Sequence, residues 1–158
     1  MNFWLFKTEP DVFSIEDLLA CTQKTSSWEG VRNYQARNYL RDSVRIKDRV
    51  LMYYSRNEPS GVIGEMEVVR SGYPDHFAFD ESSEYFDPKS KKESPTWYMV
   101  DVKYLKTLDR MISLKEIKSN PKLKEMVLVK NSRLSIQPVT REEYKEIIRM
   151  AGAKTLDV

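Results

Sequence analysis

One stretch of the sequence, residues 28–38 (WEGVRNYQARN), gathers side chains that could recognise a nucleobase. Asparagine and glutamine amides pair with donors and acceptors on a base edge. An indole can stack on a base or enclose a methyl group, and arginines and a helix N-terminus favour phosphate. The competing interpretation is that Trp28 belongs to the hydrophobic core and Asn33 caps a helix, and composition alone favours this second interpretation.

The sequence offers few groups for catalysis. His76 and Cys21 are the only histidine and cysteine, so we expect no metal site built from these residue types. The sequence also lacks the glycine-rich phosphate loops and the nucleophile elbow of common enzyme families. Glu65 and Glu67 alternate along a predicted strand, and we expect both carboxylates to point into solvent. We therefore expect a protein that is not an enzyme and uses neither a cofactor nor a metal.

The elements that would position these residues alternate along the chain. We expect strands at residues 3–7, 49–55, 62–70, 97–105 and 134–138, with turn residues at 57–61 that make a hairpin of the second and third. Capping boxes at 14–17, 113–116 and 140–143 predict short helices, a further helix covers 33–42, and Gly152 ends the last one. A polar loop is expected at 79–95. Antiparallel strands with outer helices predict an α+β fold, with a small barrel as a variant.

Length and composition predict one soluble domain. The chain has 158 residues, of which 41% are hydrophobic and 32% charged, and no apolar run approaches the length of a membrane helix. We expect a domain over residues 1–150 and a tail over 151–158, without a signal peptide, in the reducing cytoplasm. The net charge is only +2, but basic residues concentrate between positions 32 and 56. That segment could form a phosphate-binding face or a solvated helix face.

Several motifs occur in an order that resembles one family, the EVE domain. Residues 3–10 (FWLFKTEP) resemble the first motif of that family, and residues 28–38 resemble its central motif. Further matches follow at residues 73–75, 85–88, 97–102 and 133–139, so the resemblance runs from about Asn2 to Ile148. One departure is Thr8, where many members have serine, and this change retains the hydroxyl group.

This resemblance implies a PUA-like fold, a curved and barrel-like mixed sheet flanked by short helices, similar to the YTH domains that read N6-methyladenine in RNA. It implies a non-catalytic module that reads a modified base, such as a methylated cytosine, in an aromatic pocket. The partner is then DNA or RNA carrying that base, in the cytoplasm or, in a eukaryote, in the nucleus. We expect a monomer that does not bind membranes.

On the same resemblance, Trp28 takes the position of a cage tryptophan that stacks on a flipped base. The other expected pocket residues are Lys7, Thr8, Val31, Asn33, Gln35, Tyr54, Ser55, Ser135, Gln137 and Pro138. Arg32, Arg37 and Arg56 are expected at the phosphate backbone, with bracing of the loop as the alternative for Arg32 and Arg37. We expect Trp4 and Trp97 in the core and Tyr73 and His76 at the rim.

Three other functions stay open at this point. A carboxylate such as Glu9 could serve a hydrolase or a base-modifying enzyme, although no other group in the sequence supports catalysis. A PUA-like module could bind structured RNA with little selectivity for a modification. The pocket could also accept a free ligand that resembles a nucleobase.

Overall fold

A computed structural model describes residues 1–131 and 133–152 of the chain. Its strands are β1 (Phe3–Thr8), β2 (Thr25–Ser27), β3 (Arg49–Tyr54), β4 (Gly61–Pro74), β5 (Tyr98–Ser113) and β6 (Ile136–Val139). Its α-helices are α1 (Ile15–Ala20), α2 (Tyr34–Asn38), α3 (Leu114–Ser119), α4 (Val127–Lys130) and α5 (Arg141–Met150). Most of the expected tail, residues 153–158, lies outside the described residues.

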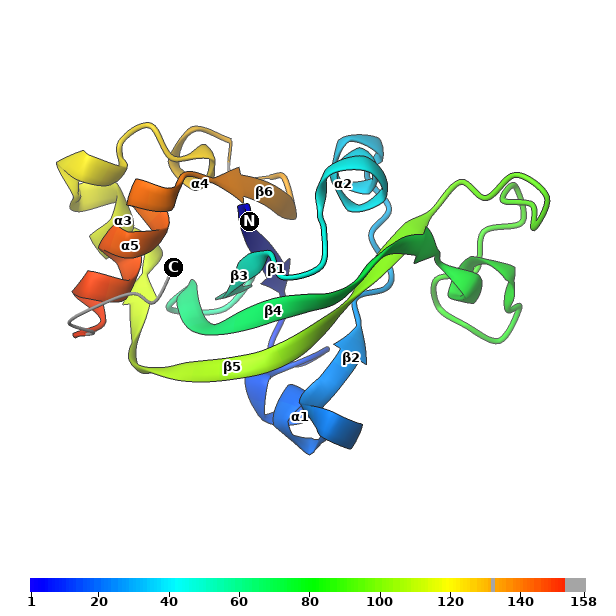
Figure 1. The fold of residues 1–158 in the computed structure, drawn as a ribbon, viewed down its shortest axis with the longest axis horizontal. Coiled ribbons are helices and arrows are strands. Elements are labelled where there is room, and N and C mark those ends of the chain that lie inside the picture. Colours follow the sequence, from blue (N-terminus) through cyan, green and yellow to red (C-terminus); the bar gives the residue numbers. More distant parts are fainter. Residues whose placement is uncertain (132, 153–158) are drawn as a thin grey trace.

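The six strands form one mixed sheet in the order β2-β5-β4-β3-β1-β6. β1 and β3 are parallel, and every other neighbouring pair is antiparallel. The sheet does not close, because β2 and β6 lie at its two edges, and the long strands β4 and β5 curve across the molecule (Figure 1). The predicted α+β class, with a curved mixed sheet flanked by short helices, is confirmed.

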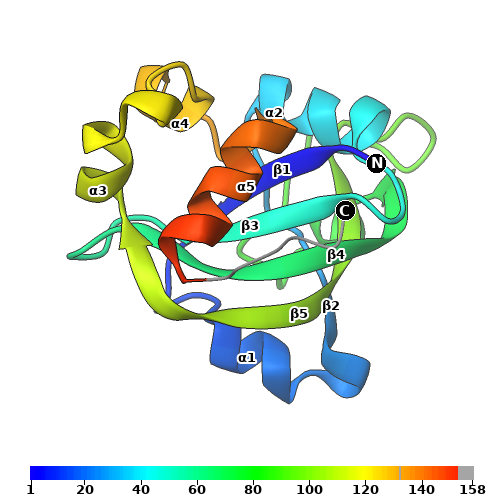
Figure 2. The ribbon, with the colours of Figure 1, turned by 60° about the vertical axis from the view of Figure 1, so that its left-hand side comes forward.

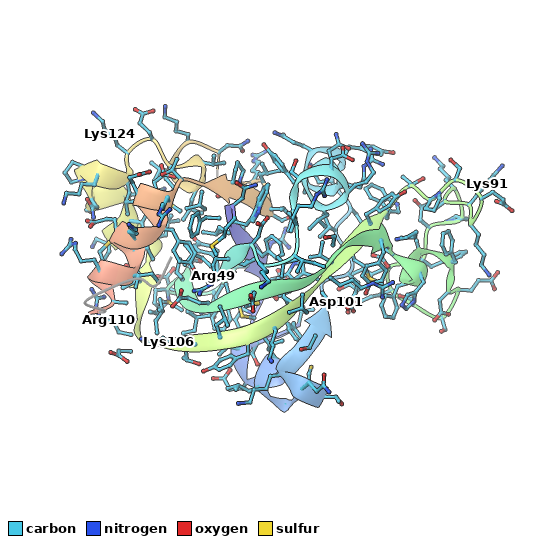
Figure 3. The ribbon with its side chains drawn as sticks, in the orientation of Figure 1. Arg49, Lys91, Asp101, Lys106, Arg110 and Lys124 are labelled. Atoms are coloured by element: carbon cyan, nitrogen blue, oxygen red, sulfur yellow. The ribbon has the colours of Figure 1, made fainter. Side chains whose placement is uncertain are left out.

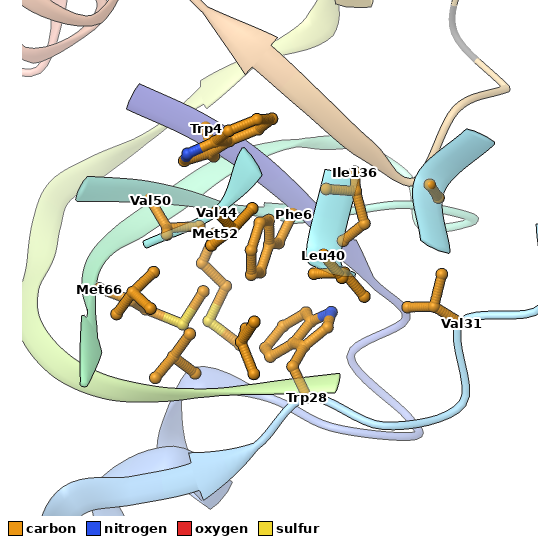
Figure 4. Packing of buried hydrophobic residues seen from close by; sticks show 14 of the residues in the cluster. Trp4, Phe6, Trp28, Val31, Leu40, Val44, Val50, Met52, Met66 and Ile136 are labelled. Atoms are coloured by element: carbon orange, nitrogen blue, oxygen red, sulfur yellow. The ribbon is translucent and has the colours of Figure 1, made fainter. Parts of the chain in front are cut away.

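The sheet carries a hydrophobic core on each face. One core contains Trp4, Phe6 and Met52 together with residues of α1 and α2 (Figure 4). The other contains alternate residues of the same strands, such as Leu5 and Leu51, under α3 and α5, and Figure 2 shows α5 lying across the strands. Because side chains alternate along a strand, the continuous apolar run of β3 is buried on both faces, as the sequence predicts.

Local helix signals are borne out. Ser14, Ser113 and Thr140 each cap a helix in a reciprocal capping box. Gly152 follows the end of α5 with a φ of +94°, a conformation that glycine adopts at little cost. Among the described residues, no helix combines the length and the apolarity needed to cross a membrane.

Elements that depend on distant pairing differ from the predictions. β5 continues to Ser113, well past the predicted end at position 105, because its second half pairs with Gly61 and Val62 of β4. The predicted helix over 33–42 is α-helical only to Asn38 and continues as a wider π-helical turn. In this turn the Val44 N–H donates to the carbonyl of Tyr39 at 2.9 Å. The loop between β4 and β5 projects beyond the sheet, with Lys91 at the opposite end of the molecule from Arg110 and Lys124 (Figure 3).

The expected solvent-facing position of Glu65 is wrong. Glu65 is only 6% exposed, and its Oε1 accepts a hydrogen bond from the Tyr144 hydroxyl at 2.7 Å. Arg49, labelled in Figure 3, lies 3.9 Å from the same carboxylate. The prediction failed because it assumed one solvated sheet face, whereas α5 covers the face on which Glu65 lies.

The contacts of Glu146 in α5 predict that the stability of the folded protein depends on pH. Hydrogen bonds from Arg149 and then from Asn120 lower the pKa of Glu146 from 4.5 to about 2. A carboxylate with a lowered pKa in the folded state stabilises the protein above its unfolded pKa and loses this effect as pH falls. We expect the difference in unfolding free energy between wild type and Glu146→Gln to shrink as pH falls from 4.5 toward 2. Urea unfolding across this range would measure it, and a difference that does not change with pH would contradict the assignment.

Candidate functional site

A cleft of about 1130 Å³ opens where the parallel strands β1 and β3 end. Lys7 and Thr8 come from the end of β1, and Ser55 follows β3, with its N–H bonded to the Thr8 carbonyl at 2.9 Å. Ser135, just before β6, bonds through its carbonyl to the Lys7 N–H at 2.9 Å. Eight predicted residues line the cleft: Lys7, Thr8, Trp28, Val31, Arg32, Ser55, Arg56 and Ser135.

Trp28 forms the floor of this cleft. It is 6% exposed, and its indole packs against Phe6, with ring centroids 5.6 Å apart (Figure 4). The Phe13 ring lies nearly perpendicular to the indole, with ring centroids 6.0 Å apart. The indole N–H groups of Trp4 and Trp97 each donate to an aspartate. Within residues 1–131 and 133–152, the Trp28 N–H has no acceptor, and Trp28 lines the cleft. Trp28 therefore belongs to the core and also offers a donor to the cleft.

The wall beside the floor is tied together by Asp75, which is completely buried. Asp75 accepts hydrogen bonds from the Gly30 N–H at 2.9 Å, from Arg32 Nη1 at 3.0 Å and from the Phe77 N–H at 3.0 Å. Arg32 also donates through Nη2 to the Tyr85 carbonyl at 2.7 Å. The guanidinium of Arg32 thus braces the cleft wall, which was the alternative role expected for it.

Tyr85 packs against Gly30 to complete this wall. Gly30 has a φ of +83°, and a Cβ atom there would lie 2.5 Å from the Tyr85 ring. Glycine is therefore required both by the backbone conformation and by the contact. Burial and the Glu84 carboxylate raise the pKa of the Tyr85 hydroxyl to about 12, so this group stays neutral and can donate a hydrogen bond.

The opposite side of the cleft is built on the end of β1. The Lys7 ammonium lies 5.6 Å from the centre of the Tyr53 ring, and partial burial lowers the pKa of Lys7. The Thr8 hydroxyl donates to the Phe13 carbonyl at 2.8 Å. Thr8 therefore positions the segment that brings Phe13 against the floor, and this role needs only the hydroxyl that serine and threonine share.

Three predicted residues around α2 do not line the cleft. Asn33 caps α2, because its Oδ1 accepts the Ala36 N–H at 3.0 Å. Gln35 is exposed on the helix surface. Arg37 donates to the Thr96 carbonyl at 2.6 Å and lies over the Tyr34 ring, so it braces the start of β5. The capping interpretation of Asn33 is the one that the structure supports.

Strand geometry explains why three further candidates lie elsewhere. Tyr54 is next to Tyr53, so its side chain lies on the other sheet face, where its hydroxyl accepts the Ile15 N–H at 2.9 Å. Gln137 is fully buried and donates to the Leu134 carbonyl at 2.8 Å. Pro138 pairs with Trp4 at the far end of β1, beside a second cavity of about 420 Å³. The rim candidates Tyr73 and His76 also lie outside the cleft lining.

Several lining residues were not anticipated, including Phe13, Glu29, Tyr85 and Arg133. Glu29 lies within residues 28–38, where the expected ligand contacts came from the indole, the amides and the arginines. Tyr85 lies in the polar loop that was expected at residues 79–95. Nothing in the local sequence indicates that residues so far apart meet at one cleft.

Charges of both signs surround the opening. The Arg56 guanidinium is 86% exposed and lies 3.5 Å from the Glu9 carboxylate, and Arg133 is also exposed. Exposed cations at a cleft mouth suit a phosphate backbone that passes over it. In the part of the chain that the structure describes, no group of three or more His, Cys, Asp or Glu side chains is arranged to hold a metal ion.

The fold and this cleft define a PUA-like domain, and comparison with known proteins identifies its family. Residues 2–150 match the EVE domain, and the chain belongs to this family. It is 40% identical to human thymocyte nuclear protein 1 in an alignment that covers 94% of this chain and 73% of that protein.

Solved structures agree along the whole domain. A hypothetical protein from Leishmania major superposes with a TM-score of 0.91 and 49% identity, covering 96% of this chain and 95% of that one. Human THYN1 in complex with DNA containing 5-methylcytosine superposes with a TM-score of 0.92 and 39% identity, covering 98% of this chain and all of that one.

Proposed function

We propose that this protein binds nucleic acid carrying a methylated base, with 5-methylcytosine in DNA as the expected ligand, and holds the base without converting it. The observation that carries the proposal is the close structural match to human THYN1, which was solved with 5-methylcytosine-containing DNA. The cleft supports it independently. Its volume of about 1130 Å³ accommodates a base with its sugar.

In the proposed complex the base leaves its stack and enters the cleft above Trp28. Lys7, Ser55 and Ser135 supply polar groups around it, and Arg56 and Arg133 face the phosphates at the mouth. Extrusion of a base costs a few kcal/mol, and contact with an aromatic side chain returns about 1–3 kcal/mol. Burial of the methyl group adds about 0.8 kcal/mol, which corresponds to about fourfold preference.

The proposal is tested by titrating the protein with duplexes that differ only in one 5-methylcytosine. We expect the methylated duplex to bind at least about fourfold more tightly than the unmethylated duplex. Both duplexes are expected to bind more weakly as the salt concentration rises, because phosphate contacts release counterions. Equal affinity for the two duplexes would contradict selective recognition of the methylated base. Tighter binding of an unmodified structured RNA of equal length would indicate the RNA-binding module instead.

The same incubation tests the absence of catalysis. We expect the mass of the oligonucleotide to be unchanged after prolonged incubation, because binding alone forms and breaks no covalent bond. Loss of the methyl group, of an amino group or of the base would instead support an enzyme that uses a carboxylate such as Glu9.

Because the relatives include nuclear proteins by name, we place the proposed activity with chromosomal DNA, in the nucleus of a eukaryote or the cytoplasm of a bacterium.

A further inference from the structure

Glu29 follows the floor tryptophan directly and lines the same cleft. Its Oε2 accepts a hydrogen bond from the Ser27 hydroxyl at 2.7 Å. Its other oxygen, Oε1, has no hydrogen-bond or ion-pair partner among residues 1–131 and 133–152, and Glu29 is partly exposed. The carboxylate is therefore oriented through one oxygen and available to a ligand through the other.

The two other carboxylates of the lining are placed differently. Glu9 lies 3.5 Å from the Arg56 guanidinium at the mouth, and Glu84 is exposed beside Tyr85. The cation nearest in sequence, Arg32, is bound to Asp75. Glu29 is thus the carboxylate that combines a position next to the floor with an unpaired oxygen.

A carboxylate accepts hydrogen bonds and cannot donate them. Cytosine and 5-methylcytosine carry an amino group, a donor, on the ring carbon next to the position of the methyl group. Thymine carries the same methyl group, but its neighbouring carbon bears a carbonyl, which is an acceptor. A pocket that recognised only the methyl group would therefore bind thymine, which is abundant in DNA, as well as 5-methylcytosine.

We propose that Glu29 is the specificity-determining residue that admits bases with an exocyclic amino group and rejects thymine and uracil. This inference rests on the proposed function, because it requires a base in the cleft. Oε1 of Glu29 accepts one N–H of the amino group, while Ser27 holds the carboxylate in position. With thymine, the carboxylate faces a carbonyl oxygen, and the hydrogen bond is replaced by repulsion between two acceptors.

Four single-stranded oligonucleotides, identical except for one central base, separate the two recognised features. Cytosine and 5-methylcytosine differ by the methyl group, as do uracil and thymine, whereas 5-methylcytosine and thymine differ in the amino group. Single strands avoid the unequal cost of breaking different base pairs. We expect wild type to bind 5-methylcytosine about 10- to 100-fold more tightly than thymine, the discrimination typical of a well-placed base contact.

Glu29→Gln is the decisive variant, because its amide can turn either a donor or an acceptor toward the base. We expect its preference for 5-methylcytosine over thymine to fall to within about threefold of unity, while the methyl preference of about fourfold stays. Ser27→Ala, which frees the carboxylate, is expected to reduce the same preference partially. Glu81 is exposed and does not line the cleft, so Glu81→Gln is expected to retain the wild-type preference.

The outcomes separate this inference from the function on which it rests. If Glu29→Gln binds 5-methylcytosine and keeps the wild-type ratio over thymine, the role of Glu29 is overturned. Equal binding of cytosine and 5-methylcytosine, together with a thymine penalty that Glu29→Gln removes, would overturn the methyl reading and support Glu29. Absence of binding to all four strands would overturn both. Circular dichroism confirms that each variant is folded, and Glu29→Ala provides a second variant at this position.

Discussion

Replacing Trp28 by alanine is expected to reduce both stability and ligand binding. The side chain is 6% exposed and packs against Phe6 and Phe13, so its removal leaves a cavity in the core. We expect the free energy of unfolding to fall by about 3–5 kcal/mol, the usual cost of truncating a buried large aromatic side chain. Because the floor also contacts the base in the proposed complex, the affinity for the methylated oligonucleotide is expected to fall at least about tenfold.

Two further variants separate these effects. Met66 is fully buried in the same core but does not line the cleft, so Met66→Ala is expected to lose about 2–5 kcal/mol of stability with unchanged affinity. Trp28→Phe retains an aromatic ring but removes the indole N–H, and a loss of about two- to tenfold in affinity is expected if that group bonds the base. Titration below the unfolding transition of each variant measures the affinity. Wild-type affinity in folded Trp28→Ala would refute the position of the base above this residue.

The parts of the fold that short-range rules control were predictable from the sequence. A capping box joins residues three positions apart, so Ser14, Ser113 and Thr140 mark helix starts whatever the rest of the chain does. The continuous apolar run of β3 indicates burial on two faces, although it does not say which strands lie beside it. The parallel pairing of β1 with β3 depends on contacts between segments more than 40 positions apart, and no local pattern specifies it.

The cleft was predictable only in part for the same reason. Its Trp28, Val31 and Arg32 come from one recognised motif, but Phe13, Tyr85 and Arg133 reach it through the topology of the sheet. A single register position separates Tyr53, which lines the cleft, from Tyr54, which does not. Because side chains alternate between faces, an uncertainty of one residue in the end of a strand reverses such an assignment.

Asn33 illustrates a different limit. Its amide has the chemistry to pair with a base, and the same amide is well suited to cap a helix. The capping bond to Ala36 is local, and it forms when α2 forms. A polar residue just before a helix therefore has a competing local partner, and its type alone does not indicate a ligand contact. Glu29, which does not precede a helix directly, retains an oxygen for the cleft.

Asp75→Ala is expected to collapse the wall that faces the floor. Asp75 is fully buried and accepts bonds from the Gly30 N–H, the Phe77 N–H and the Arg32 guanidinium. Breaking a buried ion pair by removing one partner costs about 3–5 kcal/mol, and because the Arg32 side chain is 24% exposed we expect a loss near the lower limit. Without Asp75, Arg32 and Gly30 no longer hold Tyr85 against the cleft, and we expect affinity for the methylated oligonucleotide to fall about tenfold or more.

Asp80→Ala is the matched control for this change. Asp80 lies in the same loop and is exposed, and among the described residues its side chain accepts hydrogen bonds only from Ser82. Its replacement is expected to change stability by no more than about 0.5 kcal/mol, which is usual for surface positions, and to leave binding unchanged. Urea unfolding measures the first quantity, and oligonucleotide titration measures the second. If Asp75→Ala matched Asp80→Ala in both measurements, the cleft wall would not depend on the buried aspartate, and Arg32 would be free to contact phosphate instead.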